Sequence, residues 1–286
     1  MKKILIVGAG AMGAAFSIPL LDNGHSVELT EPYNFKLLQK LNSKNKFHPS
    51  LNINLPKKLK INKFSSDILN RKWDLIVIAV SSIGIDLVGK NLSKARLKSP
   101  ILVLTKGLKL DGRNLISMSS LLRKYNKNLN ISVLKGPCLA KELARKVKSF
   151  TVIANKNINT AKKIGKLIST NYYQTEFSRD VNGVEFLSAI KNIYSMIIGS
   201  GQWHNTSSAL FRKSIDEMKY LSNYFKGKKE TVYGLAGLGD LYVSAMGGRN
   251  SKMGEYLGKG YTFNQAKKKF MKNDTCLLYT SPSPRD

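Results

Sequence analysis

The chain is poor in cysteine, and it has no apolar run long enough to cross a bilayer. Only two of its 286 residues are cysteines, Cys138 and Cys276, so a disulfide framework is excluded. A membrane-spanning helix needs about 20 consecutive, mostly apolar residues. The Lys2-Lys3 start leads directly into a strand-like run instead of a cleavable signal. These absences predict a cytoplasmic protein without a membrane span.

Histidine is also scarce, and acidic residues are far outnumbered by basic ones. His25, His48 and His204 are too dispersed to argue for a metal site, so we expect no metal. Lys and Arg number 47 against 18 Asp and Glu, and the resulting net charge of +29 would suit a nucleic-acid binder. However, the lysines are scattered along the sequence, and we find no nucleic-acid recognition motif in it. We therefore expect a solvated basic surface that steers anionic small molecules, and no nucleic-acid partner.

The pattern of apolar residues predicts two domains. Continuous apolar runs at 73–80, 101–107 and 131–136 are typical of strands buried on both faces, and the runs at 150–154 and 172–177 extend the same sheet. Strand-like runs alternate with helices, which favours an α/β, Rossmann-type, mostly parallel sheet over residues 1–180. After Asp180 the spacing becomes helical. Residues 181–275 are therefore predicted to form an all-α substrate domain, beginning with a long, largely buried helix.

A glycine-rich turn follows the first strand-like run, Ile4 to Val7. Gly8, Gly10 and Gly13 stand in GxGxxG register between a strand and a helix, around Ala11 and Met12. This spacing places a pyrophosphate on the N-terminus of the helix. A second strand ends at Glu31, whose carboxylate can accept the adenine ribose hydroxyls. These residues predict a dinucleotide site, with a glycine turn and a solvated Glu31 as the alternative.

Three more strand ends carry small or polar residues. Ser81, Lys106 and Gly136 each follow an apolar run, and ligands of open α/β sheets collect at the carboxyl ends of strands. The segment GPCLA at 136–140 is predicted to begin a helix, with Pro137 in its first turn. The amides at such a helix start favour an anion.

Glycines and polar residues also cluster near the end of the chain. The run GLAGLGDL at 234–241 brings backbone segments close together around Asp240, and GGRN at 247–250 follows it. Arg249 offers a guanidinium fork and Asn250 an amide, which suits a small phosphorylated ligand. Asp240 could also cap a helix that starts at Leu241, with or without a role in the site.

Five ordered motifs carry a resemblance to the NAD-dependent glycerol-3-phosphate dehydrogenase family over nearly all of residues 1–275. They are FHPSLNINLP at 47–56, LTKGL at 104–108, LKGPCLAKELA at 134–144, AIKNIYSMIIGSG at 189–201 and ETVYGLAGLGDLYVSAMGGRN at 230–250. The chain departs from the family at Cys138, where Ser or Thr is usual and where a thiol is a weaker hydrogen-bond partner.

The resemblance implies roles for individual residues. Lys191 is the expected proton donor, Asp240 its partner, and Lys106 a second cation; burial and a neighbouring cation lower a lysine pKa from about 10.4 toward neutrality. A snorkelling surface lysine is the alternative for Lys191. The expected substrate contacts are Lys106, Gly136, Cys138, Lys191, Asn192, Asp240, Ser244, Arg249 and Asn250. The expected cofactor contacts are Gly8, Gly10, Ala11, Met12, Gly13, Glu31, Ser81, Lys106, Ala140 and Arg249.

The resemblance implies reversible reduction of dihydroxyacetone phosphate to glycerol 3-phosphate for glycerophospholipid synthesis. NAD or NADP is the expected cofactor, and the choice stays open because Glu31 would repel a 2′-phosphate while Lys36 and Lys40 would offset it. Two alternatives remain: another Rossmann-type dehydrogenase of a small hydroxy or oxo acid, and a catalytically silent basic binding protein. The sequence leaves the oligomeric state open, a homodimer included.

The last eleven residues, Cys276 to Asp286, break off the family pattern. CLLYTSPSPRD resembles the translation of an adapter used to prepare sequencing libraries, so residues 276–286 are interpreted as a non-native tail. On this interpretation the helical domain ends early, without its final helices, and Cys138 is the one native thiol.

Overall fold

The computed structural model describes residues 1–95 and 97–272. The chain divides into two compact units, Met1–Val181 and Asn182–Asp286. The adapter-like tail lies outside the described residues.

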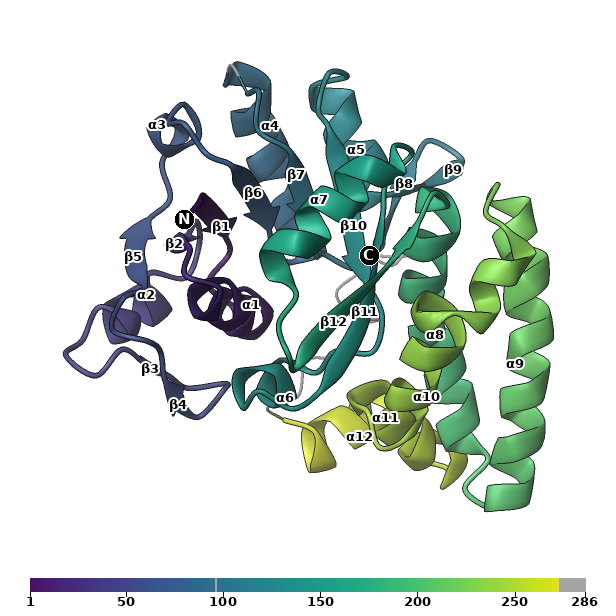
Figure 1. Cartoon of the computed structure of the whole chain (residues 1–286). Helices are drawn as coiled ribbons and strands as arrows, with labels where there is room; N and C mark the ends of the chain where they lie inside the picture. The colour runs from purple at the N-terminus through teal and green to yellow at the C-terminus, as the bar shows by residue number, and fades with distance from the viewer. Residues whose placement is uncertain (96, 273–286) are drawn as a thin grey trace. The chain divides into compact units, whose positions relative to one another are not determined.

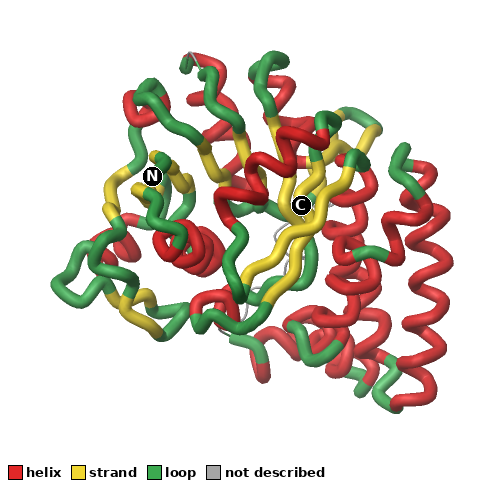
Figure 2. Tube along the Cα trace, viewed as in Figure 1, coloured by secondary structure: helices red, strands yellow, loops and turns green. Residues whose placement is uncertain are grey.

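The first unit is built on an eight-stranded sheet in the order β12-β11-β10-β7-β6-β1-β2-β5 (Figures 1 and 2). Its strands are β1 (Lys3–Val7), β2 (Ser26–Glu31), β5 (Lys60–Lys63), β6 (Leu75–Ile78), β7 (Ile101–Val103), β10 (Ile131–Lys135), β11 (Ser149–Ala154) and β12 (Tyr173–Ser178). Neighbouring strands are parallel except β10 and β11. The predicted Rossmann-type sheet is confirmed.

Helices cover both faces of this sheet. They are α1 (Ala11–Asp22), α2 (Phe35–Leu41), α3 (Ser66–Leu69), α4 (Ile85–Lys94), α5 (Met118–Tyr125), α6 (Ala140–Ala144) and α7 (Ile158–Ile168). Helix α1 packs with α6 and α7, whereas α4 packs with α3 and α5 (Figure 1). The apolar runs that predicted the strands form the core: β6, β7 and β10 are buried along their whole length, because a sheet with helices on both faces has no solvent side.

Two short hairpins lie outside the main sheet. They are β3 (Phe47–His48) with β4 (Ile53–Asn54), and β8 (Leu108–Asp111) with β9 (Asn114–Ser117). The second turns at Gly112, where φ is +61°, a conformation that glycine adopts at little cost. The first contains the HP part of the FHPSLNINLP motif.

The predicted helix start at Gly136 is wrong. Helix α6 begins at Ala140, so Pro137 stands three residues before it. Gly136 has a φ of +120°, and Leu139 is extended, so the chain turns away from helical geometry over this segment. With five residues, α6 is also too short to act as a strong helix dipole.

The second unit is helical. Its helices are α8 (Val181–Ser200), α9 (His204–Tyr224), α10 (Asp240–Ala245), α11 (Arg249–Gly258) and α12 (Phe263–Phe270), coloured from green to yellow in Figure 1. Most of α8 is buried, as its apolar sequence predicted. Glycines let α11 approach α8 closely: a Cβ on Gly199 would lie 2.1 Å from the Ser251 carbonyl oxygen, and one on Gly254 would lie 1.9 Å from that of Met196. No helix among the described residues is long and apolar enough to cross a membrane.

Candidate functional site

In the first unit, predicted cofactor and substrate residues lie along one edge of the sheet. Strands β10, β7, β6, β1 and β2 are consecutive and parallel, so their carboxyl ends point the same way. Each of these strands is followed by, or ends in, a predicted site residue. In the same order as the strands, these are Gly136, Lys106, Ser81, the glycine-rich loop and Glu31. The structure thus brings together residues that are more than 100 positions apart in sequence, at the edge where such folds bind ligands.

The glycine-rich loop shows why glycine stands at two of its positions. A Cβ on Gly8 would lie 2.7 Å from the Ala79 backbone, and one on Gly13 would lie 1.9 Å from the Gly8 carbonyl oxygen. Gly8 also has a φ of +110°, which L side chains rarely adopt. These glycines let β1, β6 and α1 pack tightly.

Gly10 is different, because a Cβ there would meet no heavy atom within 4 Å. Gly10 is the N-cap of α1, and no side chain caps this helix, so the amides at its start are available to a ligand. The loop therefore has one side packed against the sheet and one side open. This geometry fits a pyrophosphate group at the positive end of α1.

Ser81 and Lys106 lie on two loops that are tied to each other. The Thr105 hydroxyl donates to the Val80 carbonyl oxygen at 2.7 Å, and a Cβ on Gly107 would lie 3.1 Å from that of Ser82. Sequence reasoning did not predict that Lys135, at the end of β10, would reinforce this arrangement. Its buried ammonium donates to the carbonyl oxygens of Thr105 (2.5 Å) and Val103 (3.3 Å). The one sequence signal was a lysine at the end of an apolar strand.

Cys138 and Ala140 belong to the segment between β10 and α6. Cys138 is half-buried, and Ala140 is the first residue of α6. The Cys138 thiol is hydrogen-bonded to Tyr173, a fully buried residue whose hydroxyl also accepts a hydrogen bond from Thr151 (3.2 Å). Burial raises the pKa of the Tyr173 hydroxyl well above its usual range.

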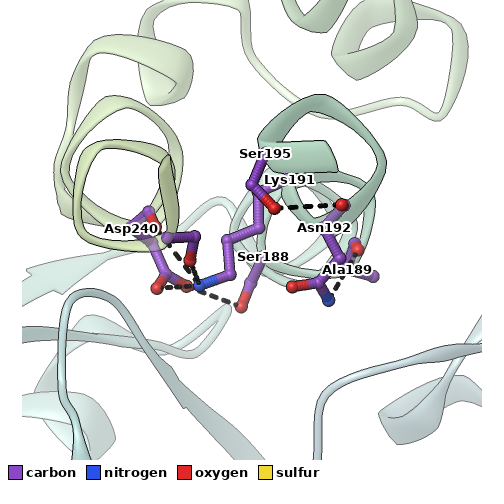
Figure 3. A network of polar contacts seen from close by, with 7 residues as sticks. Ser188, Ala189, Lys191, Asn192, Ser195 and Asp240 are labelled. Carbon is purple, nitrogen blue, oxygen red and sulfur yellow. Dashed lines mark hydrogen bonds and ion pairs between the residues drawn. The ribbon is translucent and has the colours of Figure 1, made fainter. Parts of the chain in front are cut away.

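In the second unit, Lys191 is a buried residue of α8 and not a surface lysine. Only 5% of it is exposed, and its ammonium forms an ion pair with Asp240 (Figure 3). The same ammonium donates to the Ser244 hydroxyl (2.6 Å) and to the Asp240 main-chain oxygen (3.2 Å). These contacts compensate the cost of burying its charge.

Asp240 is held by a second helix residue that sequence reasoning missed. The Ser188 hydroxyl donates to Asp240 Oδ2 at 3.2 Å, while Lys191 binds Oδ1 (Figure 3). Ser188 and Lys191 are three residues apart, so they lie on one face of α8. Asp240 is the first residue of α10 and Gly239 is the N-cap, so the alternative in which Asp240 caps a helix from Leu241 is wrong.

Local backbone geometry brings Asp240 to α8. A wide π-helical turn, Leu235–Gly239, precedes α10, and a Cβ on Gly237 would lie 2.2 Å from the Val232 carbonyl oxygen. Such turns are rare and frequently lie at functional sites. Among the glycines of GLAGLGDL, Gly237 therefore serves a close backbone approach, whereas a Cβ on Gly234 would make only an ordinary contact, 3.5 Å from the Thr231 carbonyl oxygen.

Asn192, Arg249 and Asn250 were the other predicted substrate contacts of this unit. The Asn192 amide donates to the Ala189 carbonyl oxygen (3.3 Å), away from the Lys191 ammonium in Figure 3. Arg249 is exposed at the first position of α11, and Asn250 beside it is buried. The Gly248 N–H donates to the Ser244 carbonyl oxygen (3.1 Å), so Ser244 links Lys191 to the residue that precedes Arg249.

The first unit has a dinucleotide-type loop on a Rossmann sheet, and the helical unit has a buried Lys–Asp pair. Together with the family matches, these features place the chain among the NAD(P)-dependent oxidoreductases that act on a CH–OH group. The family models for the N-terminus and the C-terminus of NAD-dependent glycerol-3-phosphate dehydrogenase match residues 3–161 and 180–276. The chain belongs to this family.

Individual relatives and a solved structure agree with the family. The chain is 30% identical over 279 residues to the NADP(+)-dependent glycerol-3-phosphate dehydrogenase of Archaeoglobus fulgidus, covering 92% of this chain and 82% of the relative. It is 30% identical over 280 residues to the NAD(P)+ enzyme of Clostridium botulinum, with 93% and 82% coverage. The crystal structure of the Coxiella burnetii glycerol-3-phosphate dehydrogenase superposes with a TM-score of 0.86 at 25% identity, covering 97% and 86% of the two chains.

Proposed function

We propose that the protein catalyses the reversible, NAD(P)H-dependent reduction of dihydroxyacetone phosphate to sn-glycerol 3-phosphate. The observation that carries the proposal is the Lys191–Asp240–Ser188 arrangement in a chain whose residues 3–161 and 180–276 match the two family models. The product is a precursor of glycerophospholipids. Neither alternative from the sequence is favoured by the comparisons.

The cofactor is NAD or NADP, and the first unit has the loop to hold it. Backbone amides at the start of α1 would bind the pyrophosphate, beside the open side of Gly10. When bound, the reduced nicotinamide supplies the hydride that adds to C2 of the substrate. We propose further cofactor contacts at the same sheet edge, from Ser81, Lys106 and Ala140.

Lys191 is proposed to give a proton to the C2 oxygen as the carbonyl becomes an alcohol, and to take it back in the reverse direction. Its ammonium has three N–H groups, and it donates hydrogen bonds to Asp240 Oδ1, Ser244 Oγ and the Asp240 main-chain oxygen. The last contact is the longest, at 3.2 Å. We propose that the substrate oxygen replaces it, while Asp240 holds the ammonium in place.

The substrate phosphate is proposed to bind at the start of α11. Gly248 is extended, and no side chain caps α11. The first N–H groups of this helix can therefore donate hydrogen bonds to an anion, together with the Arg249 guanidinium. Asn192 and Asn250 are also proposed to contact the substrate. The substrate contacts that the family resemblance implies for Gly136, Cys138 and Lys106 stay predictions.

The activity assay compares substrates and cofactors in parallel. We expect the purified protein to oxidise NADH or NADPH, followed by the loss of nicotinamide absorbance, with dihydroxyacetone phosphate but not with unphosphorylated dihydroxyacetone or 2-oxo acids. Equal turnover of a 2-oxo acid and dihydroxyacetone phosphate would contradict the proposed substrate. Activity with neither class would contradict the proposed enzyme.

Replacing Arg249 with methionine is expected to raise the KM for dihydroxyacetone phosphate about 10- to 100-fold, because hydrogen bonds to charged groups contribute about 1.5–3 kcal/mol. The effect on kcat should be smaller, since the phosphate takes no part in the bond changes at C2. The matched control is Arg212→Met on α9, which removes another exposed guanidinium, one that pairs with Asp216. An Arg249→Met protein with an unchanged KM would show that the phosphate binds elsewhere.

A further inference from the structure

Ala9, between the first two glycines of the dinucleotide loop, is held by two side chains from elsewhere in the chain. Its N–H donates to Glu31 Oε2 at 2.8 Å, and its carbonyl oxygen lies 3.0 Å from His48 Nε2. Glu31 ends β2, and His48 belongs to β3 in the FHPSLNINLP motif. All three residues are buried, with exposures of 0%, 5% and 1%.

Glu31 binds backbone amides with both of its carboxylate oxygens. Besides Ala9, it accepts hydrogen bonds from the N–H groups of Tyr33 (2.9 Å) and Asn34 (3.1 Å) at Oε1. Three N–H donors are enough to stabilise a buried carboxylate without a cation. This carboxylate therefore ties the turn after β2 to the glycine-rich loop.

The tautomer of His48 follows from its partners. The Ala9 carbonyl oxygen can only accept, so Nε2 carries the proton, and Nδ1 accepts from the Leu51 N–H at 3.4 Å. Burial lowers the pKa of His48, which agrees with a neutral ring whose Nδ1 lone pair is used.

These two contacts fix the peptide groups on either side of Ala9. The Ala9–Gly10 peptide is trans, so its N–H points opposite to its carbonyl oxygen. Because His48 binds that oxygen, the Gly10 N–H faces away from His48. Gly10 is also the loop glycine whose Cβ would meet no other atom, so the amide is set next to the open side of the loop.

We infer that His48 and Glu31 are positioning residues that hold the glycine-rich loop in the shape that binds the dinucleotide. Glu31 then acts on the loop through Ala9, in place of the contact to the adenine ribose that its position after β2 predicted. This inference rests on the proposed function for the identity of the ligand. It gives the His of the HP motif a role that does not involve touching substrate.

The test measures NADH and NADPH binding to the purified full chain by calorimetry, without substrate. His48→Leu removes the donor and leaves a buried carbonyl group unpaired, so we expect about 10-fold weaker binding of the preferred dinucleotide. His48→Gln can place an amide N–H near the Nε2 position, and its affinity should stay within about 3-fold of wild type. Hydrogen exchange at the Gly8–Gly13 amides should be faster in His48→Leu than in His48→Gln.

Two controls separate positioning from stability and from ribose binding. His25→Leu replaces a second histidine, which is partly buried and whose Nε2 contacts the Leu167 backbone carbonyl oxygen, and it should leave dinucleotide affinity unchanged. Glu31→Gln should weaken binding of NADH and of its 2′-deoxyadenosine analogue by the same factor, because the analogue lacks only the hydroxyl that a ribose contact would use.

The inference is overturned if His48→Leu binds as tightly as wild type, if His48→Gln is as weak as His48→Leu, or if the Glu31→Gln effect vanishes with the 2′-deoxy analogue. It is also overturned if wild type binds neither dinucleotide. By contrast, a wild-type protein that binds NADH or NADPH through this loop but does not reduce dihydroxyacetone phosphate would contradict the proposed function alone.

Discussion

Replacing Lys191 with methionine is expected to lower kcat for reduction of dihydroxyacetone phosphate by about 10²- to 10⁴-fold, the usual contribution of a positioned general acid. Methionine fills a similar volume but has no proton to give to the C2 oxygen. Dinucleotide affinity should hardly change, because the glycine-rich loop belongs to the other unit. Steady-state kinetics and a binding titration on the same preparation measure both quantities.

The same substitution also removes one partner of a buried ion pair. An Asp240 carboxylate left without Lys191 is expected to lower the free energy of unfolding by about 3–5 kcal/mol. Only 2% of Asp240 is exposed, so water does not replace the ammonium. Loss of activity by itself would therefore not separate chemistry from folding.

A double variant resolves this ambiguity. When Lys191→Met is combined with Asp240→Asn, the ion pair is replaced by two neutral side chains, and the new amide can still pair with the Ser188 hydroxyl. We expect thermal stability to recover toward wild type while kcat stays low. Lys213→Met, which removes an exposed ammonium on α9, is the control for loss of a positive charge. A single or double variant with near wild-type kcat would eliminate Lys191 as the proton donor.

The Lys191–Asp240 contact shows how much of the site local sequence could predict. Lysine within an apolar helix requires a partner, and a carboxylate among glycines can approach closely, so the pairing followed from physical chemistry and the family resemblance. Ser188 was missed because a serine in a helix is ordinary, and only the packing of α10 on α8 gives its hydroxyl a carboxylate to bind.

Strand positions in the first unit followed from continuous apolar runs, but strand direction did not. β10 and β11 are antiparallel, and an apolar run buried on both faces has the same appearance in either direction. The β8–β9 hairpin was missed although the chain has an Asp-Gly pair, Asp111-Gly112, which is a strong hairpin signal.

The contacts of Glu31, His48 and Lys135 could not be predicted from local sequence. Each links positions 22 to 39 residues apart through a backbone group, and a backbone N–H or carbonyl group leaves no signature in the sequence. A carboxylate after β2 predicts a ribose contact by analogy, and the three backbone amides that bind this carboxylate in the structure could not be predicted in the same way.

Alanine substitutions at Gly10 and Gly13 are expected to separate the two functions of the dinucleotide loop. In Gly13→Ala, the new methyl group would lie 1.9 Å from the Gly8 carbonyl oxygen and 3.1 Å from the Ala79 Cβ, so β1 and α1 must move apart. Overpacking of this kind costs about 1–3 kcal/mol or more. We expect a clear fall in the thermal midpoint of the ligand-free protein, together with loss of dinucleotide binding.

Gly10→Ala should leave stability nearly unchanged, within about 0.5 kcal/mol, because its φ of −60° and ψ of 175° suit alanine and a Cβ meets no atom within 4 Å. The methyl group would nevertheless occupy the open side of the loop, where the pyrophosphate must approach the backbone. We expect NADH and NADPH affinity to fall more than about tenfold, the equivalent of about 1.4 kcal/mol. Thermal unfolding and calorimetric titration measure the two effects separately, and wild-type affinity in Gly10→Ala would mean that the pyrophosphate does not bind at this loop.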